Sequence, residues 1–373
     1  MAYSGRQLHS MIDASGNLTL SLKQVIVPDP DDDEVIVRVE ATPINPSDLG
    51  LLLGPADVSS LKEDSAGSRL TFTIPPGRLG PVAGRLGQSL AAGGEGAGTV
   101  VAAGKNAAEF VGKTVAMLAG GMYSDYRLIR AENVVVVPDG ATAAQSASMF
   151  VNPQTSLGFV ETARLEGHKA IIHAPAASNL GRMLQRICLA DDIPLINIVR
   201  SQAQVEIMRS LGATRILNSN DDDFVARLTD EIAAVEATVA FDAIGGGSLG
   251  STILHAMERA AIRNMKVYDR YGSDTFKQLY IYGNLDQSET IINRAGLGYN
   301  WGACGWLLPP FLQKIGEDGA DRLRKRIVDE LTTTFSSHYT RTITLSEALQ
   351  PEILRAYARR AAGEKFLVNP ALG

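Results

Sequence analysis

Cysteine is scarce in this sequence, with Cys188 and Cys304 the two examples in a chain of 373 residues. A structural zinc site needs about four clustered cysteine or histidine ligands, and a disulfide framework needs more cysteine pairs. The five histidines are scattered along the chain and form no ligand motif. We therefore expect no metal site and no disulfide framework, and we expect both thiols to be reduced.

Long apolar runs and an excess of basic residues are also missing. No stretch approaches the roughly 20 apolar residues of a membrane-spanning helix, and the N-terminal segment has no apolar signal core. The 35 basic residues are outnumbered by 41 acidic ones, so the net charge is −6. Nucleic-acid binding needs a basic face, so this charge argues against a nucleic-acid partner. Together with the missing apolar runs, it indicates a cytoplasmic protein without a membrane partner.

What the chain does contain is the pattern of a dinucleotide site between Lys169 and Arg200. A short apolar run at 170–173 is followed by small residues and then by apolar side chains at helical spacing. A second apolar run, at 195–199, completes a β-turn-α-β unit. This unit is the frame of a dinucleotide-binding site.

The turn of this unit is a degenerate form of the Gly-x-Gly-x-x-Gly fingerprint, with Ala176, Ser178 and Gly181 at the three positions. Small side chains allow a pyrophosphate to approach the backbone. The start of the helix, at Asn179 and Leu180, offers free N–H groups and the positive end of the helix dipole. Gly181 would let the helix pack close to the strand. The alternative is a tight strand-to-helix turn that binds nothing.

The end of the second strand distinguishes between the two nicotinamide cofactors. An NAD site usually has Asp or Glu there, which accepts a hydrogen bond from the ribose 2′-hydroxyl. Here Val199 is followed by Arg200 and Ser201, and a guanidinium suits a 2′-phosphate. We therefore expect NADP(H), with a solvated arginine as the alternative.

The first 150 residues have the pattern of a strand-rich domain. Val35, Val37 and Val39 alternate with polar residues, and glycine and proline punctuate the segments between short apolar runs. This pattern predicts an irregular, β-barrel-like domain. A chain of this length is expected to form two domains.

Two segments of this region, 41–48 (ATPINPSD) and 93–100 (GGEGAGTV), carry a resemblance to a known family. These two segments come before the β-turn-α-β unit, and this order of motifs resembles the medium-chain dehydrogenase/reductase superfamily. The resemblance covers nearly the whole chain. The resemblance implies an α/β fold and a homodimer. It implies a GroES-like β-barrel catalytic domain at 1–154 and 319–373, and a Rossmann domain with a doubly wound parallel sheet at 155–318.

The residues of these segments indicate which branch of the superfamily the chain resembles. Zinc-binding members place a cysteine in the segment matching 44–48 and a histidine in the segment matching 93–95, where this chain has Asn45 and Gly94. Without thiolate or imidazole ligands a catalytic zinc has nothing to hold it. The resemblance is therefore to the zinc-independent quinone oxidoreductases and 2-enoyl thioester reductases.

The thioester reductases are similar in three short segments, 43–48, 151–155 and 196–200. One departure is that they carry a tyrosine soon after the first segment, whereas residues 51–57 contain none. Two further segments, 57–92 and 264–277, are longer than the family pattern. The first is either a lid or wall of the active-site cleft or a surface insertion, and the second is a dimer contact, a cleft wall or a plain loop.

Candidate catalytic residues come from the first domain. Tyr123, in the turn after an apolar strand, could donate a hydrogen bond to negative charge on a substrate oxygen, or it could be a packing tyrosine. Asn45 is the second candidate, and Asp48 is expected to hold its turn. The resemblance adds Thr155 near the nicotinamide.

The resemblance also implies cofactor contacts after two later strands of the Rossmann domain, at Gly245 and Gly283. Trp301 and Trp306 could pack on a flat substrate, or in a core or dimer interface.

These features predict an oxidoreductase that transfers hydride from NADPH to a small electrophile, either a quinone or an α,β-unsaturated carbonyl compound. The first alternative is a 2-enoyl thioester (acyl-CoA or acyl-carrier-protein) reductase. The second alternative is an NADPH-binding protein with little catalysis, since a fold does not by itself imply chemistry.

Overall fold

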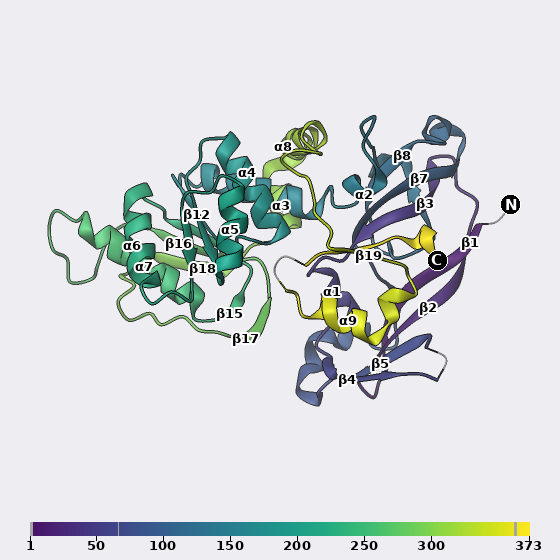
Figure 1. The fold of residues 1–373 in the computed structure, drawn as a ribbon, viewed down its shortest axis with the longest axis horizontal. Helices are drawn as coiled ribbons and strands as arrows, with labels where there is room; N and C mark the ends of the chain where they lie inside the picture. Colours follow the sequence, from purple (N-terminus) through teal and green to yellow (C-terminus); the bar gives the residue numbers. More distant parts are fainter. Residues whose placement is uncertain (1–2, 66, 362–363) are drawn as a thin grey trace. The chain divides into compact units, whose positions relative to one another are not determined.

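The computed structural model describes residues 3–65, 67–361 and 364–373 (Figure 1). The described chain forms two compact units. Unit 1 consists of the segments 1–151 and 330–373, and unit 2 is the continuous segment 152–329. Residues 1–2, 66 and 362–363, which the sequence assigns to the catalytic domain, lie outside the described residues.

Unit 1 is built on two sheets. The five-stranded sheet has the order β4-β5-β2-β1-β6, and the seven-stranded sheet has the order β10-β8-β7-β3-β20-β19, with β9 also paired to β3. The strands of the first sheet are β1 (Tyr3–Ile12), β2 (Asn17–Val27), β4 (Asp57–Glu63), β5 (Arg69–Thr73) and β6 (Ser89–Ala91). The strands of the second are β3 (Glu34–Pro43), β7 (Glu95–Ala103), β8 (Thr114–Leu118), β9 (Tyr126–Arg130), β10 (Val134–Val136), β19 (Arg341–Ile343) and β20 (Phe366–Val368). The short helices of this unit are α1 (Asp48–Leu52), α2 (Ala143–Ser146) and α9 (Pro351–Ala358).

Apolar alternation places the core of the seven-stranded sheet on one face of β3. Val35, Val37 and Val39 are each 0% exposed and pack in one cluster with Val100 of β7 and Val115 of β8. Successive side chains of a strand point to opposite faces. The alternation in the sequence therefore predicted this face correctly.

The long segment 57–92 adds regular structure to the five-stranded sheet. Its strands β4 and β5 pair antiparallel with each other, and β5 pairs with β2. Two short 3-10 helices, Pro76–Arg78 and Gly80–Arg85, connect them to β6. The segment thus forms the edge of a sheet rather than an irregular loop.

The last strand of the chain lies inside the seven-stranded sheet. β20 pairs parallel with β19 and antiparallel with β3, with Leu367 opposite Pro43 and Val368 opposite Thr42. This pairing brings the residue before β20, Lys365, next to the turn that follows β3.

Unit 2 contains a six-stranded parallel sheet with the order β13-β12-β11-β14-β16-β18. Its strands are β11 (Ile171–Ala174), β12 (Leu195–Val199), β13 (Ile216–Asn218), β14 (Val239–Asp242), β16 (Lys277–Ile281) and β18 (Trp301–Gly305). A small separate pair is formed by β15 (Gly245–Gly247) and β17 (Asp286–Thr290). The helices are α3 (Val151–Leu165), α4 (Asn179–Ala190), α5 (Gln202–Ser210), α6 (Phe224–Val235), α7 (Leu249–Arg263) and α8 (Leu308–Asp329).

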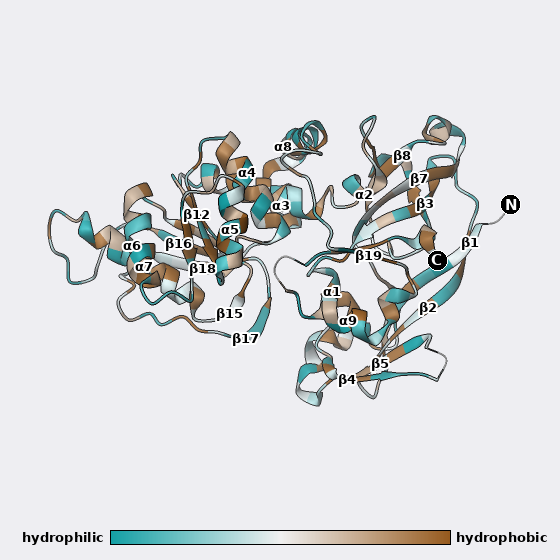
Figure 2. Ribbon diagram, viewed as in Figure 1, coloured by the Kyte–Doolittle hydropathy of each residue, from teal (hydrophilic) through white to brown (hydrophobic). Residues whose placement is uncertain are grey.

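The central strands of this sheet are buried on both faces. Every residue of β11, β12 and β14 is buried, and most are hydrophobic, as Figure 2 shows for β12. Strands covered on both faces are typical of parallel sheets flanked by helices. The continuous apolar runs in the sequence therefore predicted β11 and β12 correctly.

The segment 264–277 is tied down at its end by a buried ion pair. Lys277 Nζ lies 2.5 Å from Glu258 Oε2, and the two side chains are 0% and 1% exposed. The Ser273 hydroxyl and backbone N–H also donate to this carboxylate. Tyr268 and Tyr271, by contrast, are 87% and 59% exposed, so the middle of the segment is a surface loop.

The two tryptophans lie in different surroundings. Trp306 is buried in the core of unit 2, where its ring packs against Phe159 and Phe311 and its Nε1 donates to the Thr162 hydroxyl. Trp301 is half-buried at the start of β18, the edge strand of the parallel sheet. Trp306 is therefore a core residue. Of the roles that the sequence left open, which were packing on a substrate, in a core or in a dimer interface, the structure supports the core.

Candidate active site

The turn between β11 and α4 is tightly packed around Gly181. A Cβ atom at this position would lie 2.2 Å from the Ala176 carbonyl oxygen, so no larger residue fits without moving the backbone. The Ser178 hydroxyl caps α4 by accepting from the Gly181 N–H at 3.1 Å. This is the close packing of helix and strand that the sequence predicted for Gly181. Asn179 and Leu180 form the first turn of α4.

Arg200 and Ser201 follow β12 at the same edge of the sheet. The Arg200 backbone is held on both sides, because its N–H donates to Gln204 Oε1 and its carbonyl accepts from Asn220 Nδ2. The exposed guanidinium has no hydrogen bond or ion pair with any residue that the structure describes. The Ser201 hydroxyl caps α5 by accepting from the Gln204 N–H. The turn is therefore rigid, while the cationic group remains open to a ligand.

Two glycines bring the ends of β14 and β16 into backbone contact. A Cβ atom on Gly245 would lie 2.7 Å from the Gly283 carbonyl oxygen, and one on Gly283 would lie 2.7 Å from the Ala243 carbonyl oxygen. The Asp242 carboxylate accepts from the backbone N–H of Ile244. Burial raises the pKa of Asp242 to about 6, although these backbone hydrogen bonds act in the opposite direction.

The predicted cofactor residues of unit 2 thus gather at one edge. The turn after β11, Arg200 after β12, Gly245 after β14 and Gly283 after β16 all follow strands of one parallel sheet. The carboxyl ends of parallel strands lie at the same edge, where open α/β sheets bind ligands. Thr155 comes from a different element, since it lies buried on α3.

Arg182 is a residue at this edge that sequence reasoning missed. Its Nε donates to the Ala177 carbonyl at 3.1 Å, so the guanidinium lies against the turn between β11 and α4. Burial lowers the pKa of this guanidinium. Its position directly after Gly181 was the available signal.

In unit 1 the predicted residues Asn45 and Tyr123 belong to one buried cluster. We call it the Asn45 cluster and define it as Asn45, Asp48, Glu95, Tyr123 and Lys365. All five residues are at most 8% exposed. They come from the turn after β3, from β7, from the turn before β9 and from the residue before β20.

Hydrogen bonds connect the members of the cluster. The Asn45 N–H donates to Asp48 Oδ2 at 2.8 Å, which confirms that Asp48 holds the Asn45 turn. The Asn45 side chain donates from Nδ2 to Glu95 Oε1 at 2.7 Å, and its Oδ1 accepts from Lys365 Nζ at 3.1 Å. Sequence reasoning missed Glu95 and Lys365 because their polar types are common and their partners are distant in the chain.

Tyr123 is packed with its hydroxyl turned inward. The residue is 1% exposed, and its hydroxyl donates to the Pro43 carbonyl at 3.1 Å. Burial, and next the nearby Asp48 carboxylate, raise the pKa of Tyr123 well above its ordinary value. The phenol therefore acts in this structure as a hydrogen-bond donor and not as an acid.

Burial also shifts the charged members of the cluster. It raises the pKa of Asp48 to about 6 and raises the pKa of Glu95. It lowers the pKa of Lys365 to about 8, although Glu95 and Asp48 both favour the charged ammonium. A carboxylate and an ammonium thus share a site from which water is largely excluded.

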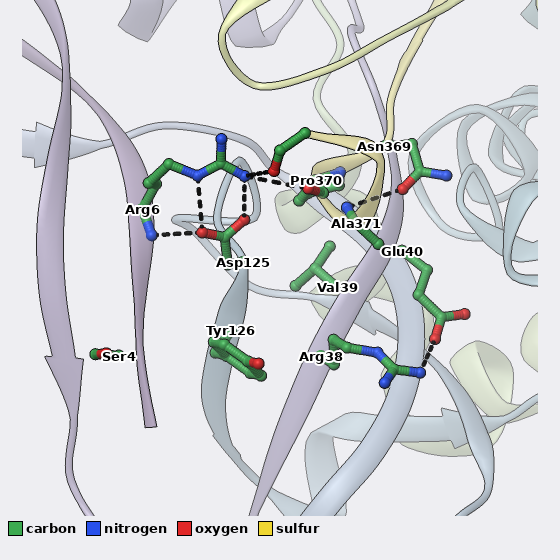
Figure 3. A pocket seen from close by; sticks show the side chains of 11 residues that line it. Ser4, Arg6, Arg38, Val39, Glu40, Asp125, Tyr126, Asn369, Pro370 and Ala371 are labelled. Atoms are coloured by element: carbon green, nitrogen blue, oxygen red, sulfur yellow. Dashed lines mark hydrogen bonds and ion pairs between the residues drawn. The ribbon is translucent and has the colours of Figure 1, made fainter. Parts of the chain in front are cut away.

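Unit 1 also has a surface pocket, drawn in Figure 3. On one side Arg6 makes a two-point contact with Asp125 and donates to the Gly373 carbonyl. On the other side Arg38 pairs with Glu40. The Arg6 contact with Gly373 holds the last residue against the sheet. Because each arginine is paired with a carboxylate, neither offers a free charge to a ligand in this pocket.

Two features of the described chain bear on metals and membranes. Its His, Cys, Asp and Glu side chains nowhere gather in groups of three or more that could hold a metal ion. Within the same residues, no helix is long and apolar enough to cross a membrane. Cys188 and Cys304 are both free thiols.

Residues 31–139 match the family model of the alcohol dehydrogenase GroES-like domain. A quinone oxidoreductase of Pseudomonas aeruginosa is 28% identical over 157 residues, which cover 41% of this chain and 48% of the relative. A mitochondrial enoyl-[acyl-carrier-protein] reductase of Xenopus tropicalis is 28% identical over 208 residues, which cover 53% of this chain and 51% of the relative. The chain thus spans about half the length of these curated relatives.

Solved structures extend the likeness to both units. The quinone oxidoreductase of Escherichia coli, solved with NADPH, has a TM-score of 0.67 and 18% identity, and the match covers 99% of this chain and 100% of that chain. At this identity the match shows a shared fold, and it agrees with the α/β architecture of a GroES-like domain and a parallel-sheet domain predicted from the sequence. The chain is therefore similar to quinone oxidoreductases and enoyl reductases, with a match to the alcohol dehydrogenase GroES-like domain at residues 31–139.

Proposed function

We propose that this protein is a zinc-independent, NADPH-dependent oxidoreductase that transfers hydride to a quinone or to an α,β-unsaturated carbonyl compound. The observation that carries the proposal is the edge of the parallel sheet in unit 2. There Gly181 brings α4 against the turn after β11, and β12 is followed by Arg200, whose guanidinium has no partner among the described residues. The relative named quinone oxidoreductase and the neighbour solved with NADPH support the reaction class and the cofactor.

The residues at this edge fit a dinucleotide with a 2′-phosphate. Only a glycine fits at position 181, and the N-terminus of α4 suits a pyrophosphate. The Arg200 guanidinium suits the 2′-phosphate because it is planar and permanently charged. Thr155, Gly245 and Gly283 are our candidates for the nicotinamide half. When bound, NADPH supplies the hydride, and the protein binds and orients it.

On the substrate side, hydride addition places negative charge on the oxygen of a quinone or enone. Asn45 and Tyr123 remain our candidates for stabilising that charge. Asn45 can donate directly, since Nδ2 carries two hydrogens and Glu95 accepts one of them. Tyr123 donates to the Pro43 carbonyl, so we assign it the support of the turn that carries Asn45. Preorganised donors of this kind are a main source of catalysis at such oxygens.

Zinc independence is part of the proposal because of the side chains at two positions. Asn45 offers an amide that already bonds Glu95 and Lys365, and Gly94 offers no side chain. Neither position supplies the thiolate or imidazole that a catalytic zinc prefers. We also propose a cytoplasmic homodimer, which the free thiols and the exposed edge strand β18 support.

The test is to compare NADPH and NADH oxidation with a small panel of acceptors in the presence of EDTA. The panel contains a para-quinone, an ortho-quinone, an α,β-unsaturated ketone, a crotonyl thioester and a plain aldehyde. We expect NADPH-specific turnover of a quinone or the ketone that survives EDTA. A preference for NADH would contradict the role of Arg200, and loss of activity with EDTA would contradict zinc independence. Tight NADPH binding without turnover would favour a binding protein.

Enoyl-thioester reduction is the second candidate function. The match to a mitochondrial enoyl-[acyl-carrier-protein] reductase over 208 residues favours it. The lack of a tyrosine in residues 51–57, where the thioester reductases carry one, counts against it. Faster turnover of the crotonyl thioester than of the ketone would select this candidate.

A further inference from the structure

We propose that Glu95 and Lys365 are positioning residues that lock the Asn45 amide in one orientation, so that Asn45 presents a polarised N–H to the substrate oxygen. This inference rests on the proposed reductase function and identifies how its oxyanion site is assembled. It assigns roles to Lys365 and to Glu95, which lies in the segment 93–100 but was given no role by the resemblance.

The first step is the arrangement of charge around the amide. Asn45 lies between a carboxylate and an ammonium, with Nδ2 2.7 Å from Glu95 Oε1 and Oδ1 3.1 Å from Lys365 Nζ. The three residues are 0% (Glu95), 2% (Asn45) and 7% (Lys365) exposed. Charges buried to this degree are stable only when they are paired and hydrogen-bonded. The amide hydrogen-bonds to both charges and so helps to stabilise them in the buried site.

The second step is that this arrangement permits one amide orientation. An amide presents a nitrogen donor at one end and an oxygen acceptor at the other. Rotating the Asn45 amide by half a turn would point the oxygen at the Glu95 carboxylate and the NH₂ group at the Lys365 ammonium, which is repulsive at both ends. The charges therefore determine the orientation, which for most asparagines must be inferred from weaker contacts.

The third step is that Glu95 itself cannot turn away. Its second oxygen, Oε2, accepts from the backbone N–H groups of Phe150 and Val151 at 3.0 and 2.9 Å. The carboxylate is thus held by three donors, two of which belong to the backbone. Lys365 is held on its other side by the Tyr339 ring, whose centroid lies 5.9 Å from Nζ.

The consequence is a donor that is fixed in direction and strengthened by its neighbour. The second hydrogen of Asn45 Nδ2 has no acceptor among the residues that the structure describes. An ammonium bonded to the amide oxygen draws electrons from the amide and makes the remaining N–H a better donor, because linked hydrogen bonds polarise one another. Asn45 is therefore the group that touches the substrate, and Lys365 acts through it.

This arrangement has a signature in the pH profile. Lys365 faces Glu95 from β7, Asp48 from α1, and Tyr339 from the segment before β19. Burial lowers the pKa of Lys365 to about 8. As pH rises through this value the ammonium is lost and the amide is no longer polarised, so we expect kcat to fall on the alkaline side.

The experiment compares Lys365→Met and Lys365→Arg with the wild type, and uses Lys105→Met, at an exposed lysine of unit 1, as the matched control. Each protein is assayed with the acceptor that the wild type reduces best, from pH 6 to pH 10. NADPH affinity is measured separately by cofactor fluorescence, and folding by thermal unfolding. Lys365→Arg retains the charge at every pH, which keeps the test usable if Lys365→Met folds poorly.

We expect Lys365→Met to lower kcat about 100-fold, the loss typical of removing one oxyanion donor. We expect its NADPH affinity to be unchanged and its alkaline fall near pH 8 to disappear. Lys365→Arg should retain more activity and show no fall near pH 8. A wild-type profile that is flat through pH 8, or a weakened NADPH affinity with unchanged kcat, would overturn the inference.

The outcomes also separate this inference from the function on which it rests. If the wild type reduces no acceptor, the proposed reductase function fails and the inference fails with it. If the wild type is active and Lys365→Met is as active as Lys105→Met, the reductase function stands and the positioning role alone is refuted.

Discussion

Arg200 is the side chain that we propose decides between the two nicotinamide cofactors. Its backbone is held by Gln204 and Asn220, so its guanidinium projects from a fixed point after β12. Neither Gln204 nor Asn220 carries a charge. We therefore expect Arg200 to supply most of the discrimination for the 2′-phosphate.

Replacing Arg200 by serine tests this expectation. Loss of a charge-assisted contact to phosphate costs about 1.5–3 kcal/mol, so Arg200→Ser should weaken NADPH binding roughly 10-fold to 100-fold. NADH binding should change little, since NADH has no 2′-phosphate. Arg209→Ser, at an exposed arginine of α5 paired with Glu206, is the control. Equal weakening of both cofactors, measured by fluorescence titration, would argue against the role.

Asp242 offers a second test at the scale of one residue. Burial raises its pKa to about 6, above the value of about 3.9 for an unfolded chain. The folded state therefore binds the proton more tightly, and the contribution of Asp242 to stability is fully present below pH 4 and is lost as pH rises through 6. Asparagine does not titrate, so in Asp242→Asn this residue makes no pH-dependent contribution to stability.

We expect the unfolding free energy of Asp242→Asn, relative to the wild type, to rise by about 3 kcal/mol between pH 4 and pH 7. Urea unfolding at four or five pH values measures this difference. The same series on Asp222→Asn, at an exposed aspartate of unit 2, is the control. If the difference in unfolding free energy between Asp242→Asn and the wild type does not change with pH, the pKa of Asp242 is not raised in the folded protein.

At the scale of elements, the packing of α4 against the turn after β11 depends on the absence of one Cβ atom. Gly181→Ala would place that atom 2.2 Å from the Ala176 carbonyl. Forcing α4 outward should cost about 1–3 kcal/mol of stability and displace the N–H groups that we assign to the pyrophosphate. Gly50→Ala, where an added Cβ meets nothing within 4 Å, should leave stability and NADPH affinity unchanged. Thermal unfolding and NADPH titration measure both effects.

Regular elements are the part of the fold that the sequence predicts best. The alternation of Val35, Val37 and Val39 and the apolar runs of β11 and β12 identify strands, because their periodicity reflects which faces are buried. The turn at Asn45 could also be predicted, since Asp48 lies three residues away and bonds the backbone locally.

Contacts between distant residues are what local patterns cannot reveal. Lys365 and Asn45 are separated by 320 positions, and Glu95 has no periodic or motif feature that links it to either. The inward direction of the Tyr123 hydroxyl likewise depends on Pro43, 80 positions away. Residue types alone cannot indicate such pairs, because they depend on how β3, β7 and β20 are ordered in the sheet.

At the scale of the whole molecule, the proposed homodimer would use the free edge of the parallel sheet. β18 pairs with β16 on one side, and its residues Ala303, Cys304 and Gly305 are exposed. An edge strand offers unpaired backbone groups to a second chain. We expect light scattering to give about twice the mass of one chain.

Ala303→Lys tests this interface, because a charge on an edge strand opposes pairing with another strand. We expect the variant to shift toward the monomer while Lys105→Met stays a dimer. An unchanged mass for Ala303→Lys would place the interface elsewhere, and a monomeric wild type would remove the proposal.

The position of β20 has a consequence for biosynthesis. A ribosome synthesises Asn45 and Glu95 well before Lys365, which lies 320 positions after Asn45. Until then Glu95 and the Asn45 amide lack their cation, and β3 lacks one of its neighbours in the sheet. Unit 2, as one continuous segment, has no such delay. Unit 2 is therefore synthesised in full before the Asn45 cluster can be completed.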